Sequence, residues 1–198
     1  MKILGVCASP RKGQTSYVAL NMALQAAQDA APEVETQLVE LAGKQVNGCL
    51  ACGKCLKEIR CSQDDYMAEL LPLLMQKDLG GIIVSSPVYL GCMTAQAKAF
   101  LDRCVPLRRN GFLLRDKVGG AIAVGGVRNG GQSLVMQQIH AAMLVHDMIV
   151  VGDGAPTSHF GGSGFSGMQG GMKSDEFGLS TAAGLGKRVA EVAAKIMA

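Results

Sequence analysis

The chain has 198 residues, of which 26 are glycine and 7 are cysteine, with no tryptophan. This length is expected to form a single domain, residues 1–198, around one core. Lys and Arg number 19 against 16 Asp and Glu, and so small a surplus gives no reason to expect a nucleic-acid partner. Apolar stretches such as Leu79–Val84 fall far short of the roughly 20 residues of a membrane span. The apolar run Ile3–Ala8 is too short for a secretory signal, so we expect a cytoplasmic protein, whose clustered cysteines serve as metal ligands or redox groups.

Strand and helix patterns alternate along the chain. Taken in order, apolar runs and helical periodicity predict a strand at 2–8, a helix at 15–31, a strand at 34–41, a cysteine-rich loop at 46–62, a helix at 62–77, a strand at 80–84, a helix at 94–105, a strand at 117–124, a helix at 131–146, a strand at 148–151 and a helix at 179–197. Five strands that alternate with helices predict an α/β fold, with a doubly wound parallel sheet covered on both faces.

One segment does not fit this alternation. Residues 152–178 contain nine glycines in 27 positions and show neither helical nor strand periodicity. Loops of this length without structure are uncommon inside a domain and are usually functional or disordered. We expect this glycine-rich segment to form a contact between subunits or a cover over a bound ligand.

The loop after the first strand, Ala8–Ser16, carries hydroxyls, an amide, two cations and a glycine directly before a helix. Backbone N–H groups and side-chain donors at a helix amino terminus bind phosphate. The loop matches neither G-x-G-x-x-G nor G-x-x-x-x-G-K-[ST], which disfavours a dinucleotide site and a P-loop nucleotidase. A phosphatase would need a thiolate inside the loop, but Cys7 lies in the strand. On the residues alone, phosphate binding and simple capping of the helix by Ser9, Thr15 and Ser16 are equally supported.

The loops after the third and fourth strands are expected at the same edge of the sheet, because ligands of open parallel sheets bind at the carboxyl ends of the strands. Within the first of these loops, Pro87–Gly91 offers an apolar wall and backbone groups to a flat ring. The alternative for Tyr89 is a core tyrosine with a satisfied hydroxyl. After the fourth strand, Gly125–Gly131 holds four glycines in seven residues, which lets a ligand approach the backbone closely.

The strongest motif is formed by Cys49, Cys52, Cys55 and Cys61, with the spacing C-x2-C-x2-C-x5-C. Four thiolates within thirteen residues are able to close around one tetrahedral metal ion or one cubane cluster. Zinc is the main alternative to an iron–sulfur cluster, although all-cysteine zinc sites usually use two separated C-x2-C pairs. Disulfides are a distant third reading. Of the other cysteines, Cys7 and Cys104 are expected in the core, and Cys92 stays undecided between packing and redox chemistry.

The loops of this sequence resemble those of the flavodoxin-like NAD(P)H-dependent FMN reductases. The resemblance is carried by Ser-Pro-Arg-Lys-x-x-Thr-Ser after the first strand, and by the Pro-Val-Tyr turn followed by Lys-x-Phe-x-Asp-Arg at Lys98–Arg103. It implies the strand order 2-1-3-4-5, an FMN phosphate in the first loop and the isoalloxazine ring beside the turn. Members of this family commonly have Asn where this chain has Gln14. The residues that we assign to FMN on this basis are Ser9, Arg11, Gln14, Thr15, Ser16, Pro87, Val88, Tyr89, Leu90, Gly91, Gly125, Gly126, Asn129 and Gly130.

With the cysteine motif added, the whole chain resembles the iron–sulfur flavoproteins of anaerobic archaea and bacteria. The Arg-Asn-Gly-Gly-Gln loop, the segment His146–Gly152 and the closing Leu-Gly-Lys-Arg-Val helix share in this resemblance. It implies one FMN and one [4Fe–4S] cluster per subunit, with Cys49, Cys52, Cys55 and Cys61 as the cluster ligands. It also implies a homodimer or homotetramer in which a cluster lies near the flavin of a neighbouring subunit.

These features predict a flavin-dependent oxidoreductase that passes electrons between a donor such as ferredoxin, the cluster and FMN. Two alternatives stay open at this point. One is an NAD(P)H-dependent FMN or quinone reductase with a structural zinc ion in the cysteine loop. The other is a non-catalytic electron carrier that uses the same cofactors.

Overall fold

The structure is a computed structural model, and it describes all residues from 1 to 198. A parallel sheet runs through the molecule in the order β2-β1-β3-β4-β5, with β6 also paired with β4, so the predicted fold class and strand order are confirmed. The strands are β1 Lys2–Cys7, β2 Glu35–Glu40, β3 Leu79–Pro87, β4 Val118–Gly125, β5 Ile149–Val150 and β6 Gly162–Phe165. The helices are α1 Thr15–Ala30, α2 Met67–Leu74, α3 Ala95–Arg103, α4 Val105–Arg109, α5 Gln132–Leu144 and α6 Glu176–Met197, with short 3-10 turns η1 Lys54–Leu56 and η2 Gly171–Ser174.

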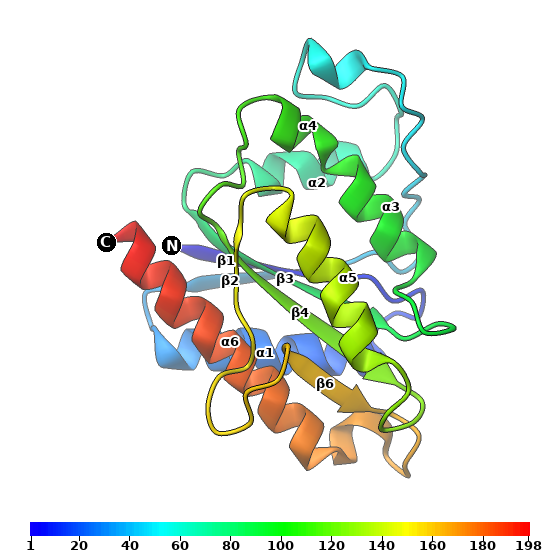
Figure 1. Cartoon of the computed structure of the whole chain (residues 1–198), viewed down its shortest axis with the longest axis vertical. Coiled ribbons are helices and arrows are strands. Elements are labelled where there is room, and N and C mark those ends of the chain that lie inside the picture. The colour runs from blue at the N-terminus through cyan, green and yellow to red at the C-terminus, as the bar shows by residue number, and fades with distance from the viewer.

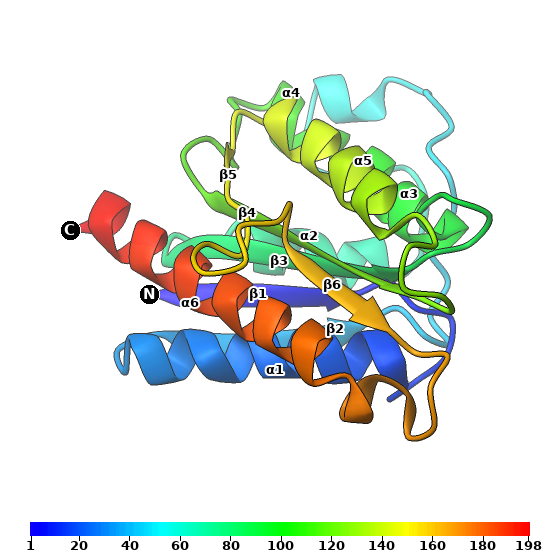
Figure 2. The ribbon, with the colours of Figure 1, turned by 60° about the horizontal axis from the view of Figure 1, so that its bottom comes forward.

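Helices cover the sheet on both faces, which gives the molecule three layers (Figures 1 and 2). Apolar residues of α2, α3 and α5 pack on one face of the sheet and form one core cluster. Apolar residues of α1 and α6 pack on the other face and form a second cluster. Every residue of β3 and β4 is buried, as expected for central parallel strands that have helices on both sides.

The predicted helices differ from the observed ones in their bounds, and two of these differences have a clear physical cause. The helix expected over 62–77 begins only at Met67, whose backbone N–H donates to the Asp65 carboxylate, and it ends at Leu74. The helix expected over 94–105 ends at Arg103, and α4 follows it as a separate short helix. Pro106 in the first turn of α4 has no N–H to donate, so α3 does not continue through this position.

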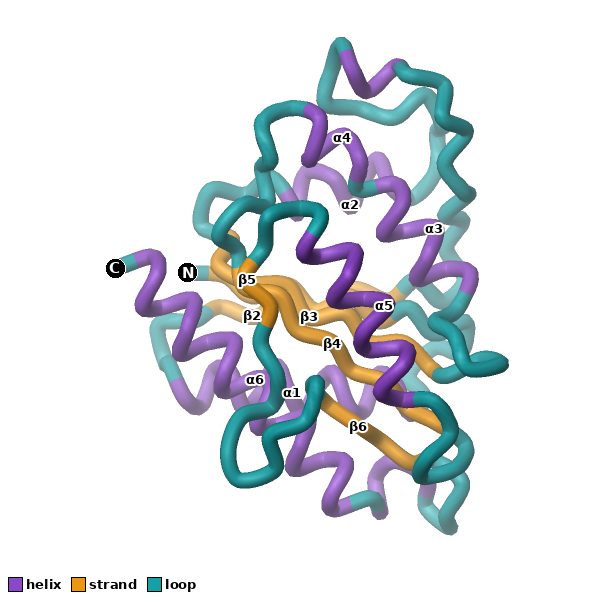
Figure 3. The backbone as a smooth tube through the Cα atoms, viewed as in Figure 1, coloured by secondary structure: helices purple, strands orange, loops and turns teal.

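Residues 152–178 were expected to form a loop without regular structure, and that prediction was wrong. This segment contains β6 and η2, which makes the sheet six-stranded instead of five-stranded. β5 pairs with Val118–Gly119 near the start of β4, and β6 pairs with Ile122–Gly125 near its end. The edge of the sheet is therefore completed by two short strands, with residues 151–161 looping out between them (Figure 3).

No helix of the structure combines the length and the apolar character that a membrane crossing requires. All seven cysteines are free thiols. Cys7 and Cys104 are buried in the two core clusters, as predicted. Burial raises the pKa of the Cys7 thiol to about 11 and that of the Cys104 thiol to about 12, so both stay protonated and act as small apolar residues.

Candidate functional site

The carboxyl ends of β1, β3, β4 and β6 lie side by side at one edge of the sheet. The parallel ladder continues one residue beyond each pair, with hydrogen bonds from Ala8 N to Ser85 O at 2.8 Å, from Val88 N to Val124 O at 3.0 Å and from Ser166 N to Gly125 O at 2.9 Å. The loops that follow these strands therefore begin at the same level. This is the place where open parallel sheets bind their ligands.

The first loop presents the amino terminus of α1, whose first N–H groups have no acceptor within the helix. Ser16 is completely buried there, and its hydroxyl oxygen has no hydrogen-bond partner. The Gly13 N–H donates to the Glu40 carboxylate at 2.8 Å, which ties this loop to the end of β2. Arg11 and Gln14 are exposed, while Ser9 is buried and accepts from the Arg11 N–H. A buried hydroxyl without a partner, next to free N–H groups, fits the phosphate of FMN.

Thr94 connects the first loop to the loop after β3. Its hydroxyl donates to the Ala8 carbonyl at 2.7 Å, and the same oxygen accepts from Ala97 N as the N-cap of α3. Its backbone N–H donates to the Ser86 hydroxyl at 3.1 Å. The sequence placed Thr94 only at the start of a helix, since nothing in its position signalled a contact with Ala8, 86 residues away.

The turn Pro87–Gly91 projects from the edge of the sheet. Tyr89 is about half exposed and pairs through its backbone with Cys92, so the alternative of a core tyrosine is wrong. Leu90 is fully exposed in the left-handed region, with φ at +51°, and therefore packs against nothing in its own chain. An exposed aromatic and an exposed aliphatic side chain on one tight turn are available to a ligand or to another subunit.

The loop after β4 is held by the buried side chain of Gln132. Its amide nitrogen donates to the carbonyls of Val127 and Gly164, and its oxygen accepts from Gly130 N at 2.8 Å. Gly131 adopts φ of +107°, and a Cβ at this position would lie 3.3 Å from the backbone of Gly91. The loops after β3 and β4 are thus in backbone contact, and a side chain at position 131 would push them apart.

The glycine-rich segment closes this edge of the sheet. A Cβ on Gly167 would lie 2.1 Å from the Gly126 carbonyl oxygen, and Gly171 lies beside the Thr15 side chain. Asp175 accepts from Phe165 N at 2.7 Å and from the Arg128 guanidinium at 2.6 Å. The glycine-rich segment therefore contacts both the loop after β1 and the loop after β4.

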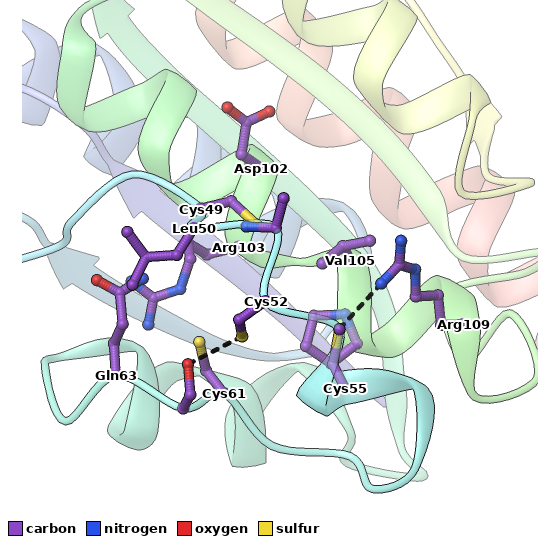
Figure 4. A pocket seen from close by; sticks show the side chains of 14 residues that line it. Cys49, Leu50, Cys52, Cys55, Cys61, Gln63, Asp102, Arg103, Val105 and Arg109 are labelled. Atoms are coloured by element: carbon purple, nitrogen blue, oxygen red, sulfur yellow. Dashed lines mark hydrogen bonds between the residues drawn. The ribbon is translucent and has the colours of Figure 1, made fainter.

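The four cysteines of the motif line one cavity, with a volume of about 190 Å³, between their own loop and α3–α4 (Figure 4). Cys55 is buried on η1, Cys61 is half-buried, and Cys49 and Cys52 are exposed. The thiols are not close enough for three or more of them to hold one metal ion in this arrangement. The four thiols are thus gathered around one cavity, as a cubane cluster with one thiolate on each iron requires, but they do not form a site for a single metal ion.

The surroundings of this cavity suit anionic ligands. Arg103 lines it with a buried side chain, and its Nε has no hydrogen-bond partner. The Ser62 hydroxyl lies 3.1 Å from Cys52 Sγ and lowers the pKa of this thiol below its ordinary value of 9.0. Four thiols around one cavity, with a buried and unsatisfied N–H donor in its wall, fit an anionic thiolate-ligated cluster.

The structure brings the predicted residues together in two groups. One group consists of the loops with Ser9–Ser16, Pro87–Gly91 and Gly125–Gly130, and the other consists of the four cysteines. Sequence reasoning missed the supporting residues Thr94 and Gln132. Arg103 belongs to the Lys-x-Phe-x-Asp-Arg motif, but no role was predicted for it. Its place in that motif was a usable signal.

The match to known proteins covers most of the chain. Residues 1–162 match the family model of the NADPH-dependent FMN reductases. The chain is 47% identical to an iron–sulfur flavoprotein of Methanocaldococcus jannaschii and 42% identical to one of Methanosarcina thermophila. Both matches run over 192 residues and cover 97% of this chain, with 97% and 95% of the two relatives.

Among solved structures, a flavodoxin-type, WrbA-like protein of Agrobacterium tumefaciens shares the fold. Its TM-score is 0.65 at 20% sequence identity, over 98% of each chain. At this identity the likeness concerns the fold alone. The sequence matches extend further, and on their evidence this chain belongs to the NADPH-dependent FMN reductase family and, within it, to the iron–sulfur flavoproteins.

Proposed function

We propose that this chain is an electron-transfer flavoprotein, a flavin-dependent oxidoreductase whose single domain holds FMN and a [4Fe–4S] cluster. The observation that carries the proposal is the cavity lined by Cys49, Cys52, Cys55 and Cys61, in a loop that starts at the end of β2. The same end of β2 contacts the first loop through Glu40 and Gly13. The loop that carries the cysteines is therefore joined through β2 to the loop proposed for the phosphate, while the cavity itself lies against the end of α3 and α4.

The residues for FMN divide by the part of the cofactor that they contact. The N–H groups at the start of α1, with Ser9, Arg11, Gln14, Thr15 and Ser16, bind the phosphate. The turn Pro87–Gly91 and the loop with Gly125, Gly126, Asn129 and Gly130 bind the isoalloxazine ring through apolar contacts and backbone groups. Gln132 and Thr94 hold these loops in place through hydrogen bonds to their backbones.

The cluster ligands are the four thiolates of the motif, which line one cavity. Together, the bound FMN and cluster exchange electrons between one-electron and two-electron partners. The protein contributes the positions of the two groups, the hydrogen bonds to the thiolates and the exclusion of water from the flavin edge.

α3 separates the two sites within one subunit. Thr94 at its start touches the first loop, and Arg103 at its end lines the cysteine cavity. Its nine residues span roughly 13 Å at the usual helical rise. This separation supports an assembly, dimer or tetramer, in which the exposed cysteine loop of one subunit approaches the flavin of another. A small one-electron protein such as ferredoxin, or NAD(P)H, is the proposed electron donor.

Metal and flavin analysis of anaerobically purified protein tests this function. About four iron atoms, four acid-labile sulfides and one FMN per chain are expected. Stoichiometric zinc without sulfide would show instead a flavin reductase with a structural metal. Steady-state reduction of a small-molecule acceptor with reduced ferredoxin or NAD(P)H then separates an enzyme from a carrier, because a carrier takes electrons from its donor but passes them only to another redox protein.

A further inference from the structure

A second arginine, Arg109 at the end of α4, reaches the cysteine cavity from the side opposite Arg103. Its guanidinium Nη1 lies 3.5 Å from Cys55 Sγ, the contact drawn as a dashed line in Figure 4. The next residue, Asn110, donates from its side chain to the Cys55 carbonyl at 3.0 Å and to the Pro106 carbonyl at 2.8 Å. The end of α4 therefore contacts both the thiol and the backbone of one predicted ligand.

The charge of Arg109 is not neutralised by a carboxylate. Arg103, the other cation of the cavity wall, forms two hydrogen bonds to Asp65 and so belongs to a neutral pair. No Asp or Glu oxygen lies within 4.0 Å of the Arg109 nitrogens. In the cysteine loop itself, Lys54 and Arg60 share Glu58. Arg109 is thus the cation of the cavity wall that retains a full positive charge beside a thiol.

We propose that Arg109 is a positioning residue for the cluster, which raises its reduction potential through a charge-assisted N–H···S hydrogen bond to the Cys55 ligand. The inference rests on the proposed function, because it needs a cluster on Cys55. Hydrogen bonds to the sulfur ligands and nearby charge are among the factors that set cluster potentials. A reduced cluster carries one more negative charge than an oxidised one, so a cation and an N–H donor stabilise the reduced form more.

The neighbouring Arg108 provides a matched control. It carries the same charge on the same short helix, but its Nε donates to the Val145 carbonyl at 2.8 Å and it does not line the cysteine cavity. The variants to compare are Arg109→Lys, Arg109→Gln, Arg109→Met and Arg108→Met. All of them are purified anaerobically, checked for iron, sulfide and FMN, and titrated to obtain the cluster and flavin potentials separately.

Arg109→Met is expected to lower the equilibrium constant for cluster reduction at least tenfold relative to Arg108→Met, which is about 59 mV for one electron. Arg109→Gln keeps an N–H donor and Arg109→Lys keeps the charge, so both should fall between wild type and Arg109→Met. The flavin potential should be the same in all four variants. Equal cluster potentials in the Arg109 and Arg108 variants would overturn the proposal.

Two further outcomes distinguish this inference from the proposed function. A wild-type protein without iron and sulfide contradicts the proposed function, and the inference falls with it. A wild-type protein with a full cluster, combined with Arg109 variants that all lose it while Arg108→Met retains it, leaves the proposed function standing. In that case Arg109 would serve cluster assembly, and its proposed role in setting the potential would be wrong.

Discussion

Arg103 and Asp65 form a fully buried ion pair at the base of the cysteine loop. Two hydrogen bonds of 2.8 Å join the guanidinium to the carboxylate, and the side chains are 1% and 0% exposed. The same two residues bind the backbone of Asn47, whose N–H donates to Asp65 and whose carbonyl accepts from Arg103. Residues 47 and 65, near the two ends of the cysteine loop, are thereby fastened to the end of α3.

Breaking this pair is expected to destabilise the whole protein. Asp65→Asn or Arg103→Met leaves one buried charge without its partner, which costs about 3–5 kcal/mol in the free energy of unfolding. Urea denaturation monitored by circular dichroism measures this loss. The exposed pair of Lys187 and Glu191 is the control, and Glu191→Gln should change the free energy by less than about 1 kcal/mol. Similar effects of the buried and exposed substitutions would contradict a structural role for the buried pair.

Stability is also expected to fall in acid through Asp65 and Asp175. Burial opposes the charged form of both carboxyls, but hydrogen bonds outweigh this effect and hold each pKa below the ordinary 3.8. Asp65 accepts these bonds from Arg103 and Asn47, and Asp175 accepts them from Arg128 and Gly178. The unfolded chain therefore binds protons first. The contribution of each carboxylate is complete above its unfolded pKa and is lost as the pH falls through the folded pKa.

The pH dependence is measured from urea midpoints between neutral pH and about pH 3, a range that includes the ordinary carboxyl pKa. Wild-type stability should begin to decline as the pH approaches 3.8. Asp175→Asn should be less stable at neutral pH and show a shallower decline, because one of the two carboxylates no longer titrates. An equally steep decline in this variant would exclude Asp175 as a source of the acid sensitivity.

Substitution of one cysteine should separate the two cofactors. Cys52→Ala is expected to abolish the cluster and leave FMN bound at one per chain, because the thiols lie beside α3 and α4 while the flavin loops follow the strand ends. Iron, sulfide and flavin contents give the result. Cys92→Ala is the control, as another exposed cysteine outside the motif, and should retain both groups. Loss of both cofactors from folded Cys52→Ala protein would argue against separate sites.

The unpaired Ser16 hydroxyl provides a test of the phosphate site. Ser16→Ala should weaken FMN binding by about 1.5–3 kcal/mol, the usual value for a hydrogen bond to a charged group, and leave riboflavin affinity unchanged. Fluorescence quenching of both flavins in the cofactor-free protein measures the two affinities. Ser180→Ala, on the exposed face of α6, controls for the substitution itself. Equal losses for FMN and riboflavin would mean that Ser16 does not contact the phosphate.

Hydrogen exchange tests whether the glycine-rich segment covers the flavin. Bound FMN is expected to slow amide exchange in residues 166–174, which lie between Gly126 and Thr15. The last turns of α6 lie outside the site and should exchange at the same rate with and without FMN. Unchanged exchange in both regions, at a protein concentration where the oligomer forms, would contradict the role of the glycine-rich segment as a cover over the flavin.

The sequence predicted the parts of the molecule that depend on local patterns. The loops Ala8–Ser16 and Pro87–Gly91 were placed correctly at strand ends, because buried apolar runs mark parallel strands well. β6 was missed because its residues Gly162–Phe165 are half glycine, and glycine carries no side chain from which a strand period is read. Its pairing with β4 is determined by long-range contacts.

The supporting contacts of the site were beyond prediction for a related reason. The partners Asp65 and Arg103 are 38 residues apart, and Arg109 and Cys55 are 54 residues apart. Asp65 and Arg109 are ordinary charged residues in their own segments. Arg103 and Cys55 belong to recognised motifs, but only the folded chain brings each of them to its partner. The cysteine motif was recognised from spacing alone, but the arrangement of its thiols around one cavity required the structure.

The completion of the sheet edge by two separate short strands, β5 and β6, has a consequence for the order in which this protein folds. Ser166 on Gly125 and Gly171 beside Thr15 complete the wall of the candidate flavin site, and both follow β6 in the chain. A nascent chain that has left the ribosome only as far as β5 has the first, third and fourth loops but lacks this wall. The candidate flavin site is therefore complete only after β6 has paired with β4, η2 has reached the first loop and α6 has packed against α1.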